Sequence, residues 1–281
     1  MPELPEVEST VQYLRERMLG LTITEAQVFW ARSIDRPSHT MFTRQIPGYA
    51  VRDIVRRGKY IVMMLEKRGA ESRFLLGHLR MSGSMDVVSE SAPLGKHDRV
   101  VLTLDGGKQL RFNDPRKFGR FYLVAEAKEV LDKLGWEPLD DSLTAGNLFS
   151  AFQTKRGAIK PVLLDQTVIA GVGNIYADEC LWRSSIHPLR SACSLSMLEV
   201  KKLLKELRCI LREAIEANGT DFGDGVVYGG GYAPRIYGRD GEACHRCKGF
   251  IKRIVVGQRG THFCPCCQPR RRIREKRANV R

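Results

Sequence analysis

The C-terminal part of the chain is organised around the segment Cys244-His-Arg-Cys-Lys-Gly-Phe-Ile-Lys-Arg-Ile-Val-Val-Gly-Gln-Arg-Gly-Thr-His-Phe-Cys-Pro-Cys-Cys267. Two C-x-x-C pairs, Cys244 with Cys247 and Cys264 with Cys267, are separated by sixteen residues. Four thiolates at this spacing suit tetrahedral coordination of zinc, and the sequence between the pairs has the pattern of a two-stranded hairpin. The segment therefore predicts a zinc ribbon that holds one structural Zn2+ ion.

The main alternative for these cysteines is disulfide pairing. The N-terminus lacks the basic and apolar segments of a secretory signal, and disulfides are rare inside cells, so zinc is favoured. Cys266 offers a competing thiol, which only the C-x-x-C register excludes. Three further cysteines lie in sequence with a helical pattern and are predicted to be buried apolar residues: Cys180, Cys193 and Cys209.

Positive charge is concentrated around this segment. The 281-residue chain has a formal net charge of +14, and residues 236–281 hold thirteen Lys and Arg against three Asp and Glu. Such asymmetry indicates a polyanionic partner. Nucleic acid is favoured over a membrane, because we find neither a basic amphipathic helix nor an apolar run long enough to cross a bilayer. The arginine-rich residues 270–281 are expected to be, in part, a solvated tail.

The sequence before the ribbon has two kinds of pattern, one typical of β-strands and one typical of helices. Together they predict an α+β multi-domain fold. A helix is expected over residues 5–18, because Val7, Val11, Leu14 and Met18 share one face. Short β-like runs follow and predict a β-sandwich or barrel: residues 23–29, 60–65, 74–78, 100–104, 110–112 and 121–124. The segment 135–138 resembles a domain junction, and residues 140–217 have helical patterns. In that part, Ser196 and Glu199 form a capping box, and Asn218-Gly219 ends the helix that it starts.

A glycine-rich turn interrupts the helical part at Ile169-Ala-Gly-Val-Gly-Asn-Ile-Tyr-Ala-Asp-Glu179. It is expected to open a helix with Asn174 as its cap. Backbone N–H groups at such a start bind phosphate readily. Glycine turns before helices are common, so this pattern gains weight only together with the basic ribbon.

The first residues, Met1-Pro-Glu-Leu-Pro-Glu-Val7, allow two readings. With Met1 removed, Pro2 is a secondary amine beside Glu3, and an α-amino group has a pKa of about 8. A secondary amine that attacks a sugar carbon gives an iminium, which keeps its positive charge and acts as an electron sink. Alternatively, proline and acids simply start the helix. That second reading explains residues 5–18 but not Pro2-Glu3.

Five sequence motifs occur in one order along the chain: PELPEVE at 2–8, HLRMSGS at 78–84, DPRKFG at 114–119, GVGNIYADE at 171–179, and the ribbon. In this order the chain resembles the formamidopyrimidine-DNA glycosylases of the Fpg/Nei family over residues 1–268. The resemblance implies a β-sandwich behind an N-terminal helix, a helical domain with a helix–two-turn–helix element, and a zinc ribbon. It divides the chain into a catalytic domain (1–136), a DNA-binding domain with a lid over the lesion (137–235), the ribbon (236–268) and a basic tail (269–281).

The resemblance also implies catalytic roles. Pro2 would attack C1′ of the damaged nucleoside, Glu3 would act as general acid and base, and Glu6 would support the site. Lys59 matches a hairpin lysine that assists base loss and binds a phosphate; its alternative is an ordinary surface lysine. Lys160 matches a lysine near the lesion pocket. β- and then δ-elimination would cut the strand on both sides of the sugar.

DNA contacts are implied in the same way. Extruding a base costs a few kcal/mol and leaves a hole in the duplex. Met81, Arg116 and Phe118 match the family's three intercalating residues, although Met81 and Phe118 could instead pack in a core; their polar flanks favour loops. The positions that match phosphate-binding residues are His97, Asn174 and Arg259. The glycine-rich residues 218–234 match the lid.

Three functions remain open at this point. The first is a glycosylase and lyase for oxidised purines such as 8-oxoguanine and formamidopyrimidines. The second is an endonuclease-VIII-like enzyme for oxidised pyrimidines, and the third is a lesion-binding protein without catalysis. Leu4 favours the first, because the pyrimidine branch usually carries glycine there, and the set Pro2, Glu3 and Lys59 speaks against the third. We expect a cytoplasmic monomer that binds double-stranded DNA with oxidised bases or abasic sites and no membrane.

Overall fold

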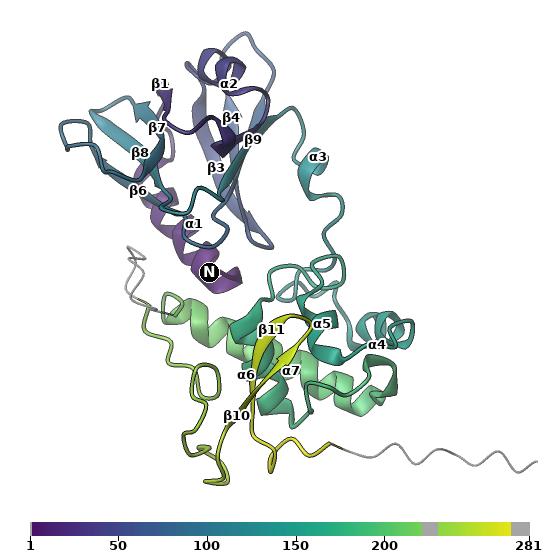
Figure 1. Cartoon of the computed structure of the whole chain (residues 1–281). Helices are drawn as coiled ribbons and strands as arrows, with labels where there is room; N and C mark the ends of the chain where they lie inside the picture. The colour runs from purple at the N-terminus through teal and green to yellow at the C-terminus, as the bar shows by residue number, and fades with distance from the viewer. Residues whose placement is uncertain (1, 221–229, 271–281) are drawn as a thin grey trace, which may run out of the picture. The chain divides into compact units, whose positions relative to one another are not determined.

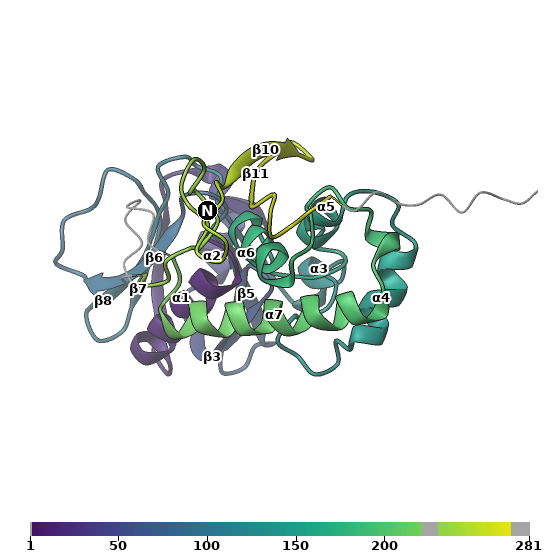
Figure 2. The same ribbon diagram turned by 90° about the horizontal axis from the view of Figure 1, so that it is seen from below.

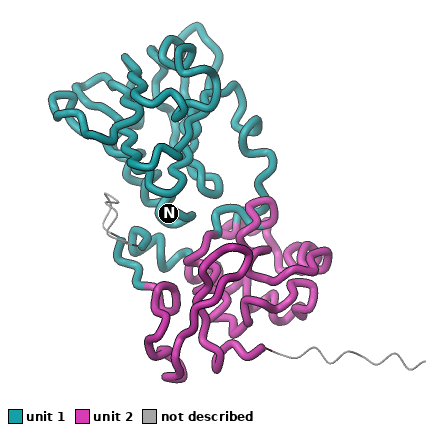
Figure 3. The backbone as a smooth tube through the Cα atoms, in the orientation of Figure 1, with its two compact units in different colours: residues 1–137, 169–172, 211–233 teal, residues 138–168, 173–210, 234–281 magenta. Residues whose placement is uncertain are grey.

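The computed structural model describes residues 2–220 and 230–270 (Figure 1). The chain forms two compact units, each built from separate stretches of sequence (Figure 3). Unit 1 comprises Met1–Glu137, Ile169–Val172 and Leu211–Ala233; unit 2 comprises Pro138–Val168, Gly173–Ile210 and Pro234–Arg281. These compact units are not consecutive along the chain. The predicted boundaries between consecutive domains, after residues 136, 235 and 268, are a different kind of division and stay a prediction.

Unit 1 contains two β-sheets with one shared apolar core. The four-stranded sheet is antiparallel and has the order β1 (Ile23–Val28), β7 (Asp98–Leu104), β8 (Lys108–Asn113), β6 (Ser84–Ser89). The five-stranded sheet has the order β2 (Ile34–Arg36), β9 (Arg120–Val124), β5 (Arg73–His78), β4 (Tyr60–Glu66), β3 (Ala50–Arg57), with β2 parallel to β9. Side chains from both sheets, such as Met63 and Leu102, are buried in the same cluster. The predicted β-sandwich is confirmed.

Helix α1 (Leu4–Met18) completes this core. Its buried face carries Val7, Val11, Leu14 and Met18, which belong to the same apolar cluster as the sheets. The spacings of four, three and four residues between these side chains place them on one side of a helix. Glu3 is the N-cap, and Pro5 lies in the first turn, where its missing N–H costs nothing. The helix predicted over residues 5–18 is confirmed.

All six predicted strand runs lie in strands, but three strands and the short helices α2 (His39–Gln45) and α3 (Lys128–Leu131) were not predicted. Strand β3 shows the reason. Its residues include two charged pairs, Arg52-Asp53 and Arg56-Arg57, and a register shift between Val51 and Asp53 breaks the alternation of buried and exposed side chains. Such a bulge removes the period of two on which strand recognition depends.

Unit 2 contains the helices α4 (Ala145–Gln153), α5 (Ile159–Leu164) and α6 (Asn174–Ser184), while α7 (Met197–Glu216) contributes to both units. Figure 2 shows α7 as one uninterrupted helix. The predicted capping box is present: the Glu199 N–H donates to Ser196 Oγ (3.3 Å), and the Ser196 N–H donates to Glu199 Oε2 (2.9 Å). After α7, Asn218 and Gly219 have φ angles of 59° and 82°, and this end of the helix is confirmed.

The ribbon hairpin consists of β10 (Lys252–Val256) and β11 (Arg259–Phe263) in antiparallel register. Its two turn residues, Gly257 and Gln258, have φ angles of 56° and 62°, as a two-residue hairpin turn of type I′ requires. Ribbon and α6 share a small core made of Trp182, Ile236, Cys244, Ile251 and Cys264. Within residues 2–220 and 230–270, no helix is both long and apolar enough to span a bilayer.

Candidate active site and nucleic-acid interface

The start of α1 places Pro2 and Glu3 in a buried setting. Pro2 is buried, and Glu3 and Glu6 are 1% and 3% exposed. One carboxylate oxygen of Glu6 accepts from the Glu3 N–H (2.8 Å), and the other accepts from the Thr220 N–H (2.9 Å). Because both oxygens of Glu6 hold backbone groups, its side chain fixes the direction in which the chain enters the helix.

Gly171 of the glycine-rich turn lies against this helix start. Its carbonyl accepts from the Leu4 N–H (3.1 Å). Its φ is +86°, and a Cβ there would lie 2.7 Å from Leu4 Cδ1, so glycine is required on both counts. The sequence predicted a phosphate site for this turn; it did not indicate that residues 169–172 support the N-terminal helix.

Lys59 lies in the tight turn between β3 and β4, after Gly58, whose φ is +58°. It is only 9% exposed, so the surface-lysine alternative is wrong. Burial, together with the positive charges of Arg80 and Lys59, lowers the pKa of His78 to about 3. The Arg80 N–H donates to His78 Nδ1 (3.0 Å), and the neutral ring therefore carries its proton on Nε2. A neutral imidazole beside Lys59 adds no competing positive charge.

Met81 and Phe118 lie in two loops of unit 1. They are 36% and 45% exposed, so the core-packing alternative is wrong for both. Arg116 is exposed in the same loop as Phe118, and its Cζ lies 5.0 Å from the centre of that ring. This arrangement leaves an apolar tip, a multi-donor side chain and an aromatic ring accessible.

Asp114, which the sequence reasoning missed, holds these loops together. It is 0% exposed, and its carboxylate accepts from Ser82 Oγ (2.7 Å), the Arg116 N–H (3.2 Å) and the Gly119 N–H (2.7 Å). Its own N–H donates to the carbonyl of His97, whose half-buried ring contacts Arg99 (Nδ1 to Nη2, 3.0 Å). One buried carboxylate thus connects the loops that carry Met81, His97, Arg116 and Phe118. The pattern Asp-Pro is typical of such turns and offered a signal.

In unit 2, Lys160 lies inside the protein. Its side chain is 0% exposed, and Nζ contacts Asp178 Oδ1 (2.7 Å), the Gly260 carbonyl (2.9 Å) and Thr261 Oγ1 (2.8 Å). Asp178 also accepts from the His262 N–H (2.8 Å). Lys160 and Asp178 therefore tie α5 and α6 to β11, the strand that begins with the exposed Arg259.

Asn174 is not the cap that the sequence predicted. The N-cap of α6 is Gly173, and Asn174 is the first helical residue. Its Nδ2 donates to the Gly260 carbonyl (3.0 Å), the same oxygen that Lys160 binds. The hairpin offers this carbonyl just after its turn, and the bond replaces the capping contact. Asn174, Lys160 and Arg259 thus meet at one end of the ribbon hairpin.

The four predicted metal ligands come together. The Sγ atoms of Cys244, Cys247, Cys264 and Cys267 all lie within 4.8 Å of one another. The separations of 3.8 Å (Cys244 to Cys267) and 3.4 Å (Cys247 to Cys264) are near the ~3.8 Å expected between thiolates at the edges of a zinc tetrahedron. Both are far longer than a disulfide bond. This donor set fits one Zn2+ ion, and the zinc prediction is confirmed.

The remaining cysteines differ from one another. Cys266 is exposed and lies outside the four-sulfur group. Cys180 is buried, and burial raises the pKa of its thiol, as expected of an inert core residue. The same prediction is wrong for Cys193 and Cys209, which are half-buried.

Residues 221–229, the middle of the predicted lid, lie outside the described residues, as does Met1. The two ends of this segment pair with each other. The Gly231 N–H donates to the Ala217 carbonyl (2.7 Å), and the Tyr232 N–H donates to the Gly219 carbonyl (2.9 Å). Because Thr220 also binds Glu6, the base of the segment is connected to the start of α1.

Three family models match in chain order. They are the formamidopyrimidine-DNA glycosylase N-terminal domain (residues 1–121), the H2TH domain of the same enzymes (134–224), and a zinc finger found in FPG and IleRS (241–270). Together with the sandwich, the helices and the four-cysteine site, these matches define a helix–two-turn–helix protein with a zinc ribbon.

Individual relatives agree over nearly the whole length. A formamidopyrimidine-DNA glycosylase of Herpetosiphon aurantiacus is 42% identical over 95% of this chain and 100% of its own. A solved MutM in complex with carbocyclic 8-oxo-G containing DNA is 34% identical, with a TM-score of 0.88 over 96% of this chain and 100% of its own. The Lactococcus lactis Fpg bound to an oxidized pyrimidine containing DNA is 33% identical, with the same TM-score and coverage. The chain belongs to the formamidopyrimidine-DNA glycosylase family.

Proposed function

We propose that the protein excises oxidised purines, such as 8-oxoguanine and formamidopyrimidines, from duplex DNA and then cuts the strand at the abasic site. The observation that carries this proposal is the buried Pro2-Glu3 pair at the start of α1, with Glu6 holding the backbone around it. Family membership supports the reaction class, and the binding of 8-oxo-G containing DNA by a solved relative supports the substrate class.

The chemistry assigns one step to each group. Once Met1 is removed, the Pro2 nitrogen attacks C1′, the glycosidic bond breaks, and the base leaves with the bonding electrons. Glu3 supplies a proton to the sugar-ring oxygen as the ring opens to an iminium, and later acts as a base. Loss of a C2′ proton then expels the 3′ phosphate, and a second elimination expels the 5′ phosphate. Lys59 assists base loss and binds a phosphate beside the lesion.

The other predicted residues handle the DNA. Met81, Arg116 and Phe118 fill the hole left by the extruded nucleotide, and their exposure on the two loops held by Asp114 supports this role. His97, Asn174 and Arg259 bind phosphates. For Lys160 we propose a positioning role, because its ammonium is enclosed by Asp178, Gly260 and Thr261 below Arg259. Zinc, held by the four cysteines, stabilises the ribbon.

We further propose that the domains are residues 1–136, 137–235 and 236–268, followed by a basic tail at 269–281. The protein acts as a monomer on one lesion at a time, and it acts in the cytoplasm, where thiolates stay reduced.

A second function, excision of oxidised pyrimidines, has an observation in its favour, because a solved relative binds oxidized pyrimidine containing DNA. Rates on a panel of single lesions separate the two. Faster release of pyrimidine lesions than of 8-oxoguanine paired with cytosine would overturn our choice. A lesion-binding protein without catalysis would release neither.

Borohydride trapping tests the mechanism. The purified protein is mixed with a duplex that holds one 8-oxoguanine opposite cytosine, reduced, digested and mapped by mass spectrometry. A covalent adduct on Pro2 is expected. If no adduct forms while Met1 is shown to be absent and the duplex is bound, the proposed mechanism is wrong.

A further inference from the structure

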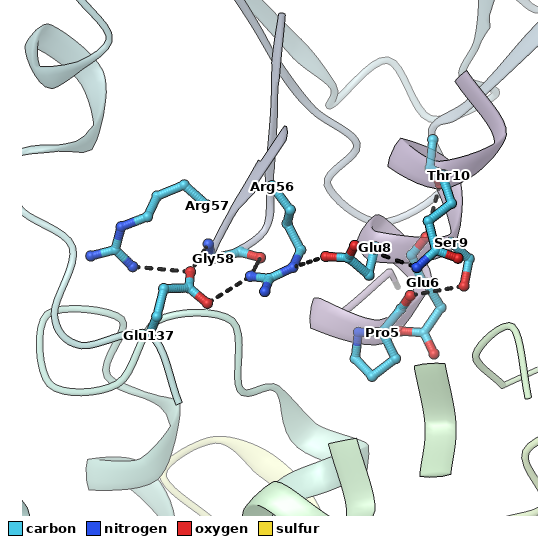
Figure 4. Close-up of polar contacts among 10 residues, drawn as sticks. Pro5, Glu6, Glu8, Ser9, Thr10, Arg56, Arg57, Gly58 and Glu137 are labelled. Atoms are coloured by element: carbon cyan, nitrogen blue, oxygen red, sulfur yellow. Dashed lines mark hydrogen bonds and ion pairs between the residues drawn. The ribbon is translucent and has the colours of Figure 1, made fainter. Parts of the chain in front are cut away.

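An ion-pair network in unit 1 joins α1, the end of β3 and Glu137 (Figure 4). Arg56 lies at its centre. Its Nε donates to Glu8 Oε2 (2.7 Å), and its Nη1 donates to Glu137 Oε2 (2.8 Å). Glu8 lies one turn into the helix that starts at Leu4. Arg56 therefore links the helix that carries Pro2 and Glu3 to a carboxylate 81 residues further along the chain.

Glu137 also holds the turn that presents Lys59. Its Oε1 accepts a short hydrogen bond from the Gly58 N–H and a second bond from Arg57 Nη1 (3.0 Å). The Gly58 carbonyl accepts from Arg56 Nη1 (3.3 Å), so both polar backbone groups of the residue before Lys59 are bound within the network. Arg57 adds bonds to the carbonyls of Leu134 (3.3 Å) and Gly135 (2.5 Å).

Burial separates this network from an ordinary surface ion pair. The side chains of Arg56, Glu137 and Glu8 are 9%, 16% and 24% exposed. The same hairpin carries a second pair, Arg52 with Glu66, whose side chains are 54% and 47% exposed. Exposed pairs contribute little, whereas buried charge-assisted bonds hold geometry strongly. The network therefore adds buried charge-assisted bonds at the end of the hairpin that bears Lys59.

We propose that Glu137 is a positioning residue that acts through Lys59. Its carboxylate fixes the Gly58-Lys59 turn, and Arg56 passes this placement to the start of α1 through Glu8, so that lysine and N-terminal proline keep one relative geometry. This inference rests on the proposed function. A displacement of a reacting group by about 1 Å can cost about 100-fold in rate.

A double-mutant cycle with Lys59 tests the proposal. Glu137→Gln keeps the shape of the side chain but removes its charge and sets an amide N–H2 group against the arginines. Base release is measured under single-turnover conditions with saturating enzyme on a duplex with 8-oxoguanine opposite cytosine, and the Kd of the duplex is measured separately. Glu66→Gln, on the same hairpin, is the matched control.

We expect Glu137→Gln to slow base release about 10-fold or more at an unchanged Kd, and Glu66→Gln to leave the rate within about 2-fold. Combined with Lys59→Ala, which itself slows release, Glu137→Gln should cause no further loss, because a residue that acts only through Lys59 has no effect once that side chain is absent. Three results would overturn the proposal. They are a double variant whose rate loss is the product of the two single losses, an unchanged rate of base release in Glu137→Gln, and an unchanged rate in Lys59→Ala.

Thermal denaturation of each variant separates a local effect from a folding defect. If Glu137→Gln does not fold, the same cycle uses Arg56→Lys, which keeps the charge but cannot bridge Glu8 and Glu137 in the same way. If the wild-type protein releases no base from any lesion, the proposed function fails. If it releases base but the cycle is additive, only this inference fails.

Discussion

At the scale of single residues, the molecule uses buried acids to place reactive or exposed groups. Glu6 holds the backbone around Pro2 and Glu3, and Asp114 holds the loops of Met81 and Phe118. A buried carboxylate whose oxygens all accept hydrogen bonds is a rigid anchor, since moving it would leave donors unsatisfied at a cost of roughly 1–3 kcal/mol each.

Replacing Pro2 tests its proposed role as the nucleophile. We expect Pro2→Gly to lose most base excision. The primary amine of glycine gives an imine that can lose its proton and become neutral, and a neutral imine withdraws electrons less strongly than the iminium of proline. Duplex binding should survive, because the Met81, Arg116 and Phe118 loops are untouched. The measurements are single-turnover base release and Kd. An unchanged release rate would show that Pro2 is not the nucleophile.

His78 provides a pH-dependent prediction. Its pKa is lowered from 6.5 to about 3 in the folded protein, so above pH 6.5 it is neutral in both the folded and the unfolded states. Between pH 6.5 and 3 only the unfolded state binds the proton, and the group lowers stability as the pH falls, by up to about 1.4 kcal/mol per pH unit.

His78→Asn removes this titration while keeping an acceptor for the Arg80 N–H. The free energy of unfolding of the variant, measured by denaturant at pH 7, 6 and 5, should therefore fall less steeply than that of the wild type. Parallel pH profiles would contradict the assigned pKa.

At the scale of elements, two sets of contacts in unit 2 stabilise the ribbon hairpin. One is the zinc site. The other is the pair Lys160 and Asp178, both 0% exposed, which joins α5 and α6 to β11. Neither set of contacts depends on the β-propensity of the hairpin residues. A two-stranded hairpin alone is only marginally stable, so the hairpin needs these contacts.

Removal of one metal ligand should release the whole ribbon. We expect Cys247→Ser to lose zinc and with it DNA binding, because Cys244 and Cys264 lie in the ribbon core and lose their cross-link. Cys266→Ser is the matched control and should retain about one zinc per chain, since Cys266 lies outside the site. Elemental analysis measures the zinc content of each variant, and a titration measures its binding to duplex DNA. Full binding by Cys247→Ser without metal would refute the prediction.

Removal of the buried lysine should also be costly. Lys160→Met leaves Asp178 charged and enclosed, and the expected loss is about 3–5 kcal/mol in the free energy of unfolding. The control Lys155→Met breaks a partly exposed pair with Asp165 (3.5 Å) and should cost less than about 1 kcal/mol. Denaturant titration compares the two. Equal, small losses would show that the buried pair carries no such weight.

At the scale of the whole molecule, charge determines how the protein meets DNA. The net charge of +14 is heavily weighted to the last 46 residues, and most of this excess lies beyond any predicted lesion contact. Charges of this kind bind phosphates without reading bases, and their effect is measured by counterion release.

Truncation after Gln268 tests whether the basic tail binds phosphates without taking part in lesion recognition. We expect weaker binding by a similar factor for damaged and intact duplexes, together with a shallower dependence of log K on log salt concentration. Excision at saturating enzyme should be unchanged. A loss confined to damaged DNA would show that the tail takes part in lesion recognition.

Local signals made much of this protein predictable. The C-x-x-C pairs, the helical periodicity of α1, the Ser196–Glu199 capping box and the six short β-like runs all depend on neighbours in sequence, and each is present in the structure. Family resemblance added the order of the motifs. The wrong predictions are of contacts: Asn174 binds Gly260 instead of capping α6, and Cys193 and Cys209 are not fully buried.

The long-range anchors are visible only in the folded chain. Gly171 supports Leu4, Asp114 joins three loops, Asp178 encloses Lys160, and Glu137 binds Arg56 from 81 residues away. A lone acid or glycine has no pattern of its own in a sequence, because its partners are set by how distant segments pack. The local sequence was thus enough for the zinc ligands and for most of the helices and strands, and together with the resemblance it predicts the reactive residues. The contacts that surround those residues depend on how distant segments pack.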